Sequence, residues 1–182
     1  MAKVDFRAKE FCFHLSDCHI KRLLKKMGLW TKSKSILATL QSDSYMTHFQ
    51  KLLRITTNGK SFHNITSKIA AIVAESGVET GLCTLFLRHT SASLVIQENA
   101  DPDVLVDLAN FMAKLVPESG QYIHDAEGAD DMPAHIRTAL THTSEHIPIN
   151  RGHLVLGTWQ GIYIWEHRQR SHSRELVVHI SG

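Results

Sequence analysis

The densest group of reactive side chains lies between His124 and His135. These twelve residues include two histidines and four carboxylates. Imidazole nitrogens and carboxylate oxygens together suit Mg²⁺, Mn²⁺ or Zn²⁺. Asp131 and His135 are four residues apart, which places both on one face of a helix. We expect a metal or catalytic site here; the alternative is a solvated acidic loop followed by a capped helix.

A second polar group, His89 to Ser93, directly follows the most hydrophobic segment of the chain. Its imidazole and three hydroxyls suit a phosphate or another anion, whereas the alternative is a turn whose Ser and Thr side chains bond their own backbone. Glu98 and Asn99 end the next apolar segment, so we expect their side chains to return near the first group. Glu98 is a candidate general base, or equally an acidic residue at a helix start.

A third group closes the segment 157–168. Alternation along a strand puts Glu166 on the same face as Ile164, and His167 on the opposite face. Gln160 lies in a glycine-flanked stretch suited to a bulge or to a close backbone approach to a ligand. The charged side chains at the end of this strand, Glu166 to Arg168, favour a functional site. The alternative is a core strand whose aromatic residues only pack in the interior.

The elements that must position these groups follow from hydrophobic periodicity. Apolar residues at helical spacing predict helices over 65–76, 103–116 and 130–140, with acidic or proline start signals for the last two. Apolar or alternating runs predict strands over 52–57, 81–88, 92–97, 154–158, 161–166 and 176–180. About seven strands and three helices that do not strictly alternate indicate an α+β fold.

Composition limits the function classes. The chain is 43% hydrophobic and 21% charged, which is typical of a globular protein, and it has no apolar run long enough for a membrane span. The odd number of cysteines, three, does not suit a disulfide scaffold. With no secretion signal, we expect a cytoplasmic protein without a membrane partner.

The first 45 residues differ from the rest. They carry nine Lys/Arg and four Asp/Glu, a net charge of +5, whereas the remainder carries eleven and fourteen, a net charge of −3. A mildly acidic body argues against a nucleic-acid partner. We expect residues 1–45 to be a basic extension that is disordered or not native, with Met46 as a candidate start. The alternative is a short basic helix around 19–30. Zinc binding by Cys12 and Cys18 is not expected, because their spacing does not fit a common motif.

Four motifs together resemble the YjbQ-like family. They are His89-Thr-Ser-Ala-Ser93, Glu98-Asn-Ala-Asp-Pro-Asp103, the string from His124 to His135, and Gly157-Thr-Trp-Gln-Gly-Ile162 with Glu166-His167. The resemblance covers 46–182 and implies an α+β fold with a β-sandwich core and flanking helices, assembled as a homotrimer with polar pockets near subunit boundaries. Members are often labelled secondary thiamine-phosphate synthases, which implies a weak transferase activity that joins a pyrimidine methyl diphosphate to a thiazole phosphate and releases pyrophosphate.

Residue roles follow as a working hypothesis. The expected catalytic residues are Glu98, Asp130, Asp131, His135 and Glu166; the expected phosphate- or substrate-binding residues are His89, Thr90, Ser91, Ser93, Asn99, Gln160 and Arg168; and the expected ligands of a divalent metal, Mg²⁺ or Zn²⁺, are His124, His135 and His167. The expected partner is a small phosphorylated metabolite, because a carboxylate-bound cation and an arginine would neutralise departing pyrophosphate. Two alternatives stay open: a non-enzymatic metal- or ligand-binding module, and a metal-dependent phosphohydrolase.

Overall fold

The structure is a computed structural model that describes Lys26 and residues 46–182. Residues 46–182 form one compact unit. Apart from Lys26, the helix expected around 19–30 lies outside the described residues, as do the two N-terminal cysteines. In the part of the chain that the structure describes, no helix is both long and apolar enough to cross a membrane.

Residues 46–182 contain eight strands and three helices, which confirms the α+β class. In chain order the elements are β1 (His48–Thr56), β2 (Ser61–Asn64), α3 (Thr66–Ser76), β3 (Thr80–Leu87), β4 (Ala92–Glu98), α4 (Pro102–Leu115), α5 (Asp131–Leu140), β5 (Ser144–Asn150), β6 (His153–Leu154), β7 (Gln160–Glu166) and β8 (Ser173–Ser181).

The strand prediction for 154–158 was wrong, because β6 ends at Leu154 and the chain then turns toward β7. Strands β2 and β5 were not predicted at all. In β5 only Ile147 and Ile149 are buried, and polar residues and Pro148 fill the other positions. Such a half-exposed strand resembles a loop in the sequence, because two apolar residues give too short an alternating pattern.

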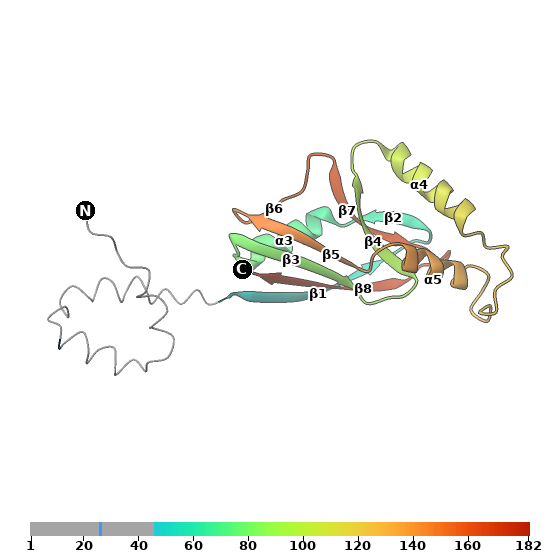
Figure 1. Ribbon diagram of the computed structural model, residues 1–182, viewed down its shortest axis with the longest axis horizontal. Helices are drawn as coiled ribbons and strands as arrows, with labels where there is room; N and C mark the ends of the chain where they lie inside the picture. The colour runs from blue at the N-terminus through green and yellow to red at the C-terminus, as the bar shows by residue number, and fades with distance from the viewer. Residues whose placement is uncertain (1–25, 27–45) are drawn as a thin grey trace. The chain divides into compact units, whose positions relative to one another are not determined.

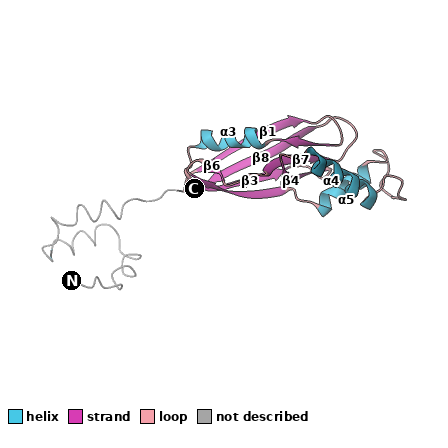
Figure 2. Cartoon of the chain, turned by 90° about the horizontal axis from the view of Figure 1, so that it is seen from above, coloured by secondary structure: helices cyan, strands magenta, loops and turns pink. Residues whose placement is uncertain are grey.

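The strands form two antiparallel sheets, with orders β1-β8-β3-β5-β6 and β2-β7-β4 (Figure 1). Both sheets and α3 contribute to one hydrophobic core, which includes Leu85, Leu94, Ile164 and Ile69. Helices α4 and α5 lie together at the end of this unit away from α3 (Figure 2). A second, smaller cluster of Met112, Val116 and Trp165 joins α4 to β7.

Helix α4 begins as its sequence predicts. The Asp101 side chain accepts a hydrogen bond from the Asp103 N–H at 2.9 Å, and Pro102 follows the cap. The apolar residues of α4 are only partly covered: Met112 is buried, whereas Phe111 is 64% exposed. Helix α4 therefore packs lightly on this single chain.

The turn between β1 and β2 is fixed by Gly59. Its φ of +92° is unfavourable for other residues, and a Cβ placed there would lie 2.5 Å from the carbonyl oxygen of Gln169. Glycine thus lets this turn pack directly on the backbone that follows β7. The turn therefore supports the C-terminal end of β7, where the predicted site residues Glu166, His167 and Arg168 lie.

Candidate metal centre

His124, Asp131 and His135 converge at the start of α5. Asp131 occupies the first turn, His135 lies one turn later, and His124 comes from the loop between α4 and α5. His124 Nε2 lies 2.7 Å from Asp131 Oδ2, and His135 Nε2 lies 3.7 Å from the same oxygen. One ligand atom from each residue lies within 4.8 Å of the other two. The predicted pairing of Asp131 and His135 on one helix face is present.

The orientation of His135 is set by the backbone. Its Nδ1 lies 2.9 Å from the Thr90 carbonyl oxygen, which can only accept a hydrogen bond. Nδ1 therefore carries a proton, and Nε2 is the ring nitrogen that faces Asp131 and His124. Histidine ligands of metals are commonly oriented by such a bond from the other ring nitrogen.

Arg168 holds the acidic side of this centre. Its Nη1 contacts Asp131 Oδ1, its Nε donates to Asp130 Oδ2 at 3.0 Å, and its Nη2 donates to the Glu127 carbonyl at 2.9 Å. Burial alone would raise the pKa of Asp130, but hydrogen bonds from the Gln169 N–H and Arg168 outweigh it and lower that pKa below its usual value. Because Arg168 contacts Asp131 through Oδ1, the other carboxylate oxygen, Oδ2, is free to face His124 and His135.

The donor set fits a borderline cation better than a hard one. Two imidazoles and one carboxylate form the three-ligand set of catalytic zinc sites, which also serves iron, whereas Mg²⁺ prefers oxygen ligands. The Asp131 side chain is 3% exposed and that of His124 is 49% exposed, so the centre is anchored on one side and open to solvent on the other. Of the two metals expected from the sequence, these residues fit zinc.

Two adjoining hollows lie beside the centre. One, of about 410 Å³, is lined by His89, Thr90, His135, Thr138, Ala139, Thr141 and Thr143, and the other, of about 440 Å³, by Phe86, Leu87, Arg88, His89, Thr90, Ser91 and Thr143. Both are rich in hydroxyl groups. His89 Nε2 accepts the Glu175 N–H at 2.7 Å, and burial with nearby Arg174 lowers the pKa of His89. Neutral His89 therefore keeps its Nδ1–H as a donor.

Glu166 lies apart from the centre in a saturated ion pair. It is 0% exposed, and it accepts hydrogen bonds from Thr57 Oγ1 at 2.7 Å, the Arg168 N–H at 3.0 Å and Arg174 at 2.5 and 2.7 Å. Burial opposes ionisation, but these donors lower the pKa of Glu166 below its usual value. No acceptor site is left for a substrate, so the geometry gives Glu166 a structural role.

His167 and Ser93 bond each other instead of joining the predicted ligands. His167 Nε2 lies 2.9 Å from Ser93 Oγ, and both side chains are buried. Successive residues at a strand end point to opposite faces, so Arg168 reaches the metal centre and His167 does not. The grouping of His167 with His124 and His135 is corrected accordingly, as is the placement of Ser93 among exposed anion donors.

Glu98, Asn99 and Gln160 gather at the other end of β4 and β7. Glu98 pairs with Gln160, and Asn99 Nδ2 donates to the Gln160 carbonyl at 3.2 Å. The Glu98 carboxylate accepts the Ala100 N–H at 3.0 Å. A seven-residue strand spans roughly 20 Å, so one chain does not bring these residues to the centre.

Sequence reasoning missed Thr138, Thr141 and Thr143, which line the hollows, and Arg174, Arg137 and Lys60. A usable signal existed for Arg174, because it occupies an inward position of a strand whose alternate residues are apolar. A charge at such a position needs a buried partner. No comparable signal marked Lys60.

Comparisons with known proteins place these features in context. Residues 51–182 match the family model "UPF0047 protein YjbQ-like". The UPF0047 protein sll1880 of Synechocystis sp. is 69% identical over 134 residues, which cover 73% of this chain and 91% of that protein. The UPF0047 protein YjbQ of Escherichia coli O157:H7 is 42% identical over 135 residues, covering 74% and 98%.

Solved structures agree with the fold. A yjbq/upf0047 family protein from Clostridium acetobutylicum is 39% identical with a TM-score of 0.65, covering 72% of this chain and 98% of that one. A YbjQ-like protein from Sulfolobus solfataricus P2 is 24% identical with a TM-score of 0.71, covering 76% and 99%, and shows the same fold.

Proposed function

The chain belongs to the UPF0047 YjbQ-like family, and from this premise we propose that residues 46–182 form a zinc-type metal centre acting on a small phosphorylated metabolite. His124, Asp131 and His135 would hold the cation. The observation that carries the proposal is the bond from His135 Nδ1 to the Thr90 carbonyl, which turns Nε2 toward the other two ligands.

Binding would displace a proton. His124 Nε2 and Asp131 Oδ2 share one at 2.7 Å, and a cation coordinated by both atoms takes its place. Arg168 stays on Oδ1 and keeps the carboxylate oriented. A cation in this site would supply positive charge to a developing anion.

The neighbouring groups suit a phosphate. Neutral His89 offers an N–H donor, and Thr90, Ser91, Thr138 and Thr143 offer hydroxyls around the hollows. Hydrogen-bond donors fixed in place stabilise a phosphoryl or pyrophosphate group without reorganisation. Our preferred reaction is a thiamine-phosphate-synthase-type transfer, in which the diphosphate leaves the methylene carbon of the pyrimidine methyl diphosphate with the bonding electrons as that carbon bonds the thiazole nitrogen.

A metal-dependent phosphohydrolase is the second candidate. It is favoured by the three-ligand set, which leaves a coordination position for water. Release of inorganic phosphate from a panel of phosphate monoesters, abolished by chelator, would assign hydrolysis. Pyrophosphate release that requires both substrates would assign transfer. Stoichiometric zinc binding without either reaction would indicate a binding module.

We also propose that the protein is a cytoplasmic homotrimer with a two-sheet sandwich core. Support comes from the outer face of the larger sheet, where Leu52, Val177 and Phe86 form one row across three strands, and Leu52 and Phe86 are exposed. Registered neighbours share a face and make an apolar surface that a second copy can cover. A neighbouring copy would also supply the Glu98 and Gln160 end of its own strands to a shared pocket.

Zinc titration of the full chain tests the metal centre. We expect one tight zinc per chain, with a proton released on binding, and loss of at least about a hundredfold in affinity for His124→Ala and His135→Ala. His153→Ala is the matched control, because His153 is exposed and distant in sequence from the ligands. Equal zinc affinity in His135→Ala and His153→Ala would sink the proposal. Full turnover by folded His135→Ala and Asp131→Ala would remove the catalytic part.

A further inference from the structure

The segment that joins β3 to β4 is tied to the beginning of β8 by two neighbouring residues. The Glu175 N–H donates to His89 Nε2 at 2.7 Å. Arg174 Nη2 donates to the Ser91 carbonyl at a longer 3.4 Å. Thr90 lies between these two contacts in the sequence, so the beginning of β8 fixes the place of its carbonyl oxygen.

The Thr90 carbonyl is the acceptor that orients His135, since it lies 2.9 Å from Nδ1 of that ring. A hydrogen bond weakens steeply as its geometry departs from the preferred distance and angle. A shift of this carbonyl would therefore release the ring that presents Nε2 to the metal centre. Arg174 thus bears on one expected ligand through a short stretch of backbone, without touching the ligand itself.

Arg174 also reaches the acidic side of the centre, by way of Glu166. Its Nε and Nη2 donate to the two Glu166 oxygens at 2.7 and 2.5 Å. Glu166 Oε1 in turn accepts the Arg168 N–H at 3.0 Å. The side chain of Arg168 is the one that contacts Asp131 Oδ1. One guanidinium therefore connects two separate segments, and each of them holds a different ligand of the centre.

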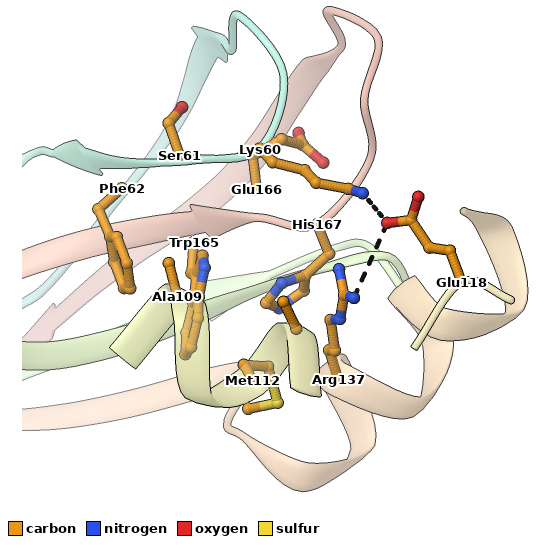
Figure 3. A pocket seen from close by; sticks show the side chains of 11 residues that line it. Lys60, Ser61, Phe62, Ala109, Met112, Glu118, Arg137, Trp165, Glu166 and His167 are labelled. Atoms are coloured by element: carbon orange, nitrogen blue, oxygen red, sulfur yellow. Dashed lines mark ion pairs between the residues drawn. The ribbon is translucent and has the colours of Figure 1, made fainter. Parts of the chain in front are cut away.

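Glu166 and His167 leave the end of β7 on opposite sides, as successive strand residues do (Figure 3). His167 lies with Met112 and Arg137 at a small cavity of about 100 Å³ beside α4, whereas the Glu166 carboxylate points to the other side of the strand. Arg174, which is 3% exposed, bonds the carboxylate there. The connection from β8 to the metal centre therefore passes through Glu166 and not through His167.

We propose that Arg174 is a positioning residue of the proposed metal centre, on which this inference rests. Through the segment at Ser91 it holds the acceptor of His135, and through Glu166 it holds the arginine that contacts Asp131. Lysine cannot replace it, because a single ammonium group lacks the planar fork that reaches a carboxylate and a carbonyl together. Arg174 does not touch the cation, so it acts only on the geometry of the ligands.

Zinc titration of a double variant with no net charge change tests this role. Glu166→Leu/Arg174→Met removes the whole buried pair, so no unpaired buried charge remains and the net charge near the cation is unaltered. We expect zinc affinity to fall about tenfold or more, as when groups behind a ligand are changed. Lys51→Met/Glu75→Leu removes an exposed ion pair between β1 and α3 and is the matched control, which should bind zinc like the unaltered chain. Equal affinities in the two double variants would overturn the proposal.

A spectrum of the metal-free chain separates positioning from stability and from metal binding. With chelator present, ring ¹⁵N–¹H correlation spectra should show His135 with its proton on Nδ1, held by the Thr90 carbonyl; the signal is assigned by its absence in His135→Gln. Glu166→Leu/Arg174→Met should move this signal, whereas that of exposed His153 should stay in place. An unchanged His135 signal would contradict the proposal. If the unaltered chain binds no zinc, the metal function fails, and this spectrum still decides the role of Arg174.

Arg174→Lys keeps the test valid if the double variant fails to fold. Lysine retains the positive charge beside Glu166 but loses the contact with the Ser91 carbonyl, so zinc affinity should fall about threefold or more and the His135 signal should move. Arg54→Lys, at an exposed arginine paired with Glu175, is the control and should change neither. Equal zinc affinity and an identical His135 signal in the two lysine variants would overturn the assignment.

Discussion

Two buried carboxylates, each paired with an arginine, perform different work in this molecule. Glu166 is enclosed by Arg174, Thr57 and a backbone N–H, with both oxygens fully occupied. Asp131 is 2% exposed, but only its Oδ1 contacts an arginine. Its Oδ2 faces the imidazoles of His124 and His135. Burial and charge are alike in the two. The number of uncommitted acceptor positions separates a structural ion pair from a candidate site.

The largest effect should come from breaking the saturated pair. Glu166→Gln leaves the Arg174 charge buried and uncompensated, and should lower the free energy of unfolding by about 3–5 kcal/mol. Urea denaturation measures this. Glu175→Gln, at a partly exposed ion pair with Arg54 and Arg88, is the control and should cost at most about 1 kcal/mol. Similar losses in the two variants would remove the distinction. A Glu166→Leu/Arg174→Met double variant should recover much of the loss.

The next largest effect should be a loss of stability at acidic pH, caused by His167 and Glu166. His167 has a folded pKa of about 3, below its unfolded value near 6.5, so the unfolded chain binds a proton that the folded chain refuses between these pH values. Its stabilising contribution is present above about pH 6.5 and is lost as pH falls toward 3, by roughly 1 kcal/mol per pH unit. The lowered pKa of Glu166 adds a loss at still lower pH, below its unfolded value near 4.3.

His167→Gln provides the control for this pH dependence. It keeps a donor and an acceptor for Ser93 but cannot titrate in this range. Unfolding free energies measured from pH 7.5 to 4.5 should fall less steeply in His167→Gln than in the unaltered chain. Parallel curves would show that His167 is not the responsible group.

Asp131→Asn should weaken zinc binding strongly and stability only moderately, whereas Glu166→Gln is expected to act mainly on stability. Zinc affinity should fall by at least about a hundredfold, because even changes to groups behind a ligand cost 10–100-fold. The free energy of unfolding should fall by only about 1–3 kcal/mol, since Asp130 and the Glu127 carbonyl still hold Arg168. Isothermal titration with zinc and urea denaturation on the same preparations separate the two. A stability loss equal to that of Glu166→Gln would mean that Asp131 is structural too.

The smallest effect is expected at Thr90. The bond that orients His135 comes from the Thr90 backbone carbonyl, so Thr90→Ala should change zinc affinity less than about threefold and stability by no more than about 0.5 kcal/mol. If the Thr90 hydroxyl instead contacts substrate, the apparent affinity for substrate should fall while zinc binding persists. A large loss of zinc would show that the side chain, and not the carbonyl, positions His135.

The parts of the site that could be predicted from the sequence are those fixed by local geometry. Asp131 and His135 were placed together by their four-residue spacing, because a helix fixes that geometry locally. His124 joins them through a loop whose path no short-range pattern encodes. His167 lies on the opposite side from Arg168, as strand alternation requires, so grouping it with the other histidines ignored a signal that was present.

Distance along the sheet explains the remaining differences. Glu98 and Asn99 were expected near the polar residues at 89–93, but they lie beside Gln160 at the far end of the paired seven-residue strands β4 and β7. Among the strands, the apolar β3 and β7 were predictable, whereas β5 alternates isoleucine with polar residues and proline and was missed. The α+β class survived this error because it depends on the clearest elements.

The strand order has a consequence for the time course of folding. β8 is the last strand of the chain, yet it lies between β1 and β3 in the larger sheet, with His48 opposite Ser181. Contacts between residues so distant in sequence close slowly, which predicts refolding in milliseconds to seconds. On the ribosome, β1 must wait for β8, and Glu166 must wait for Arg174 on that same strand. The ion pair that contributes most to stability therefore forms only after the final strand emerges.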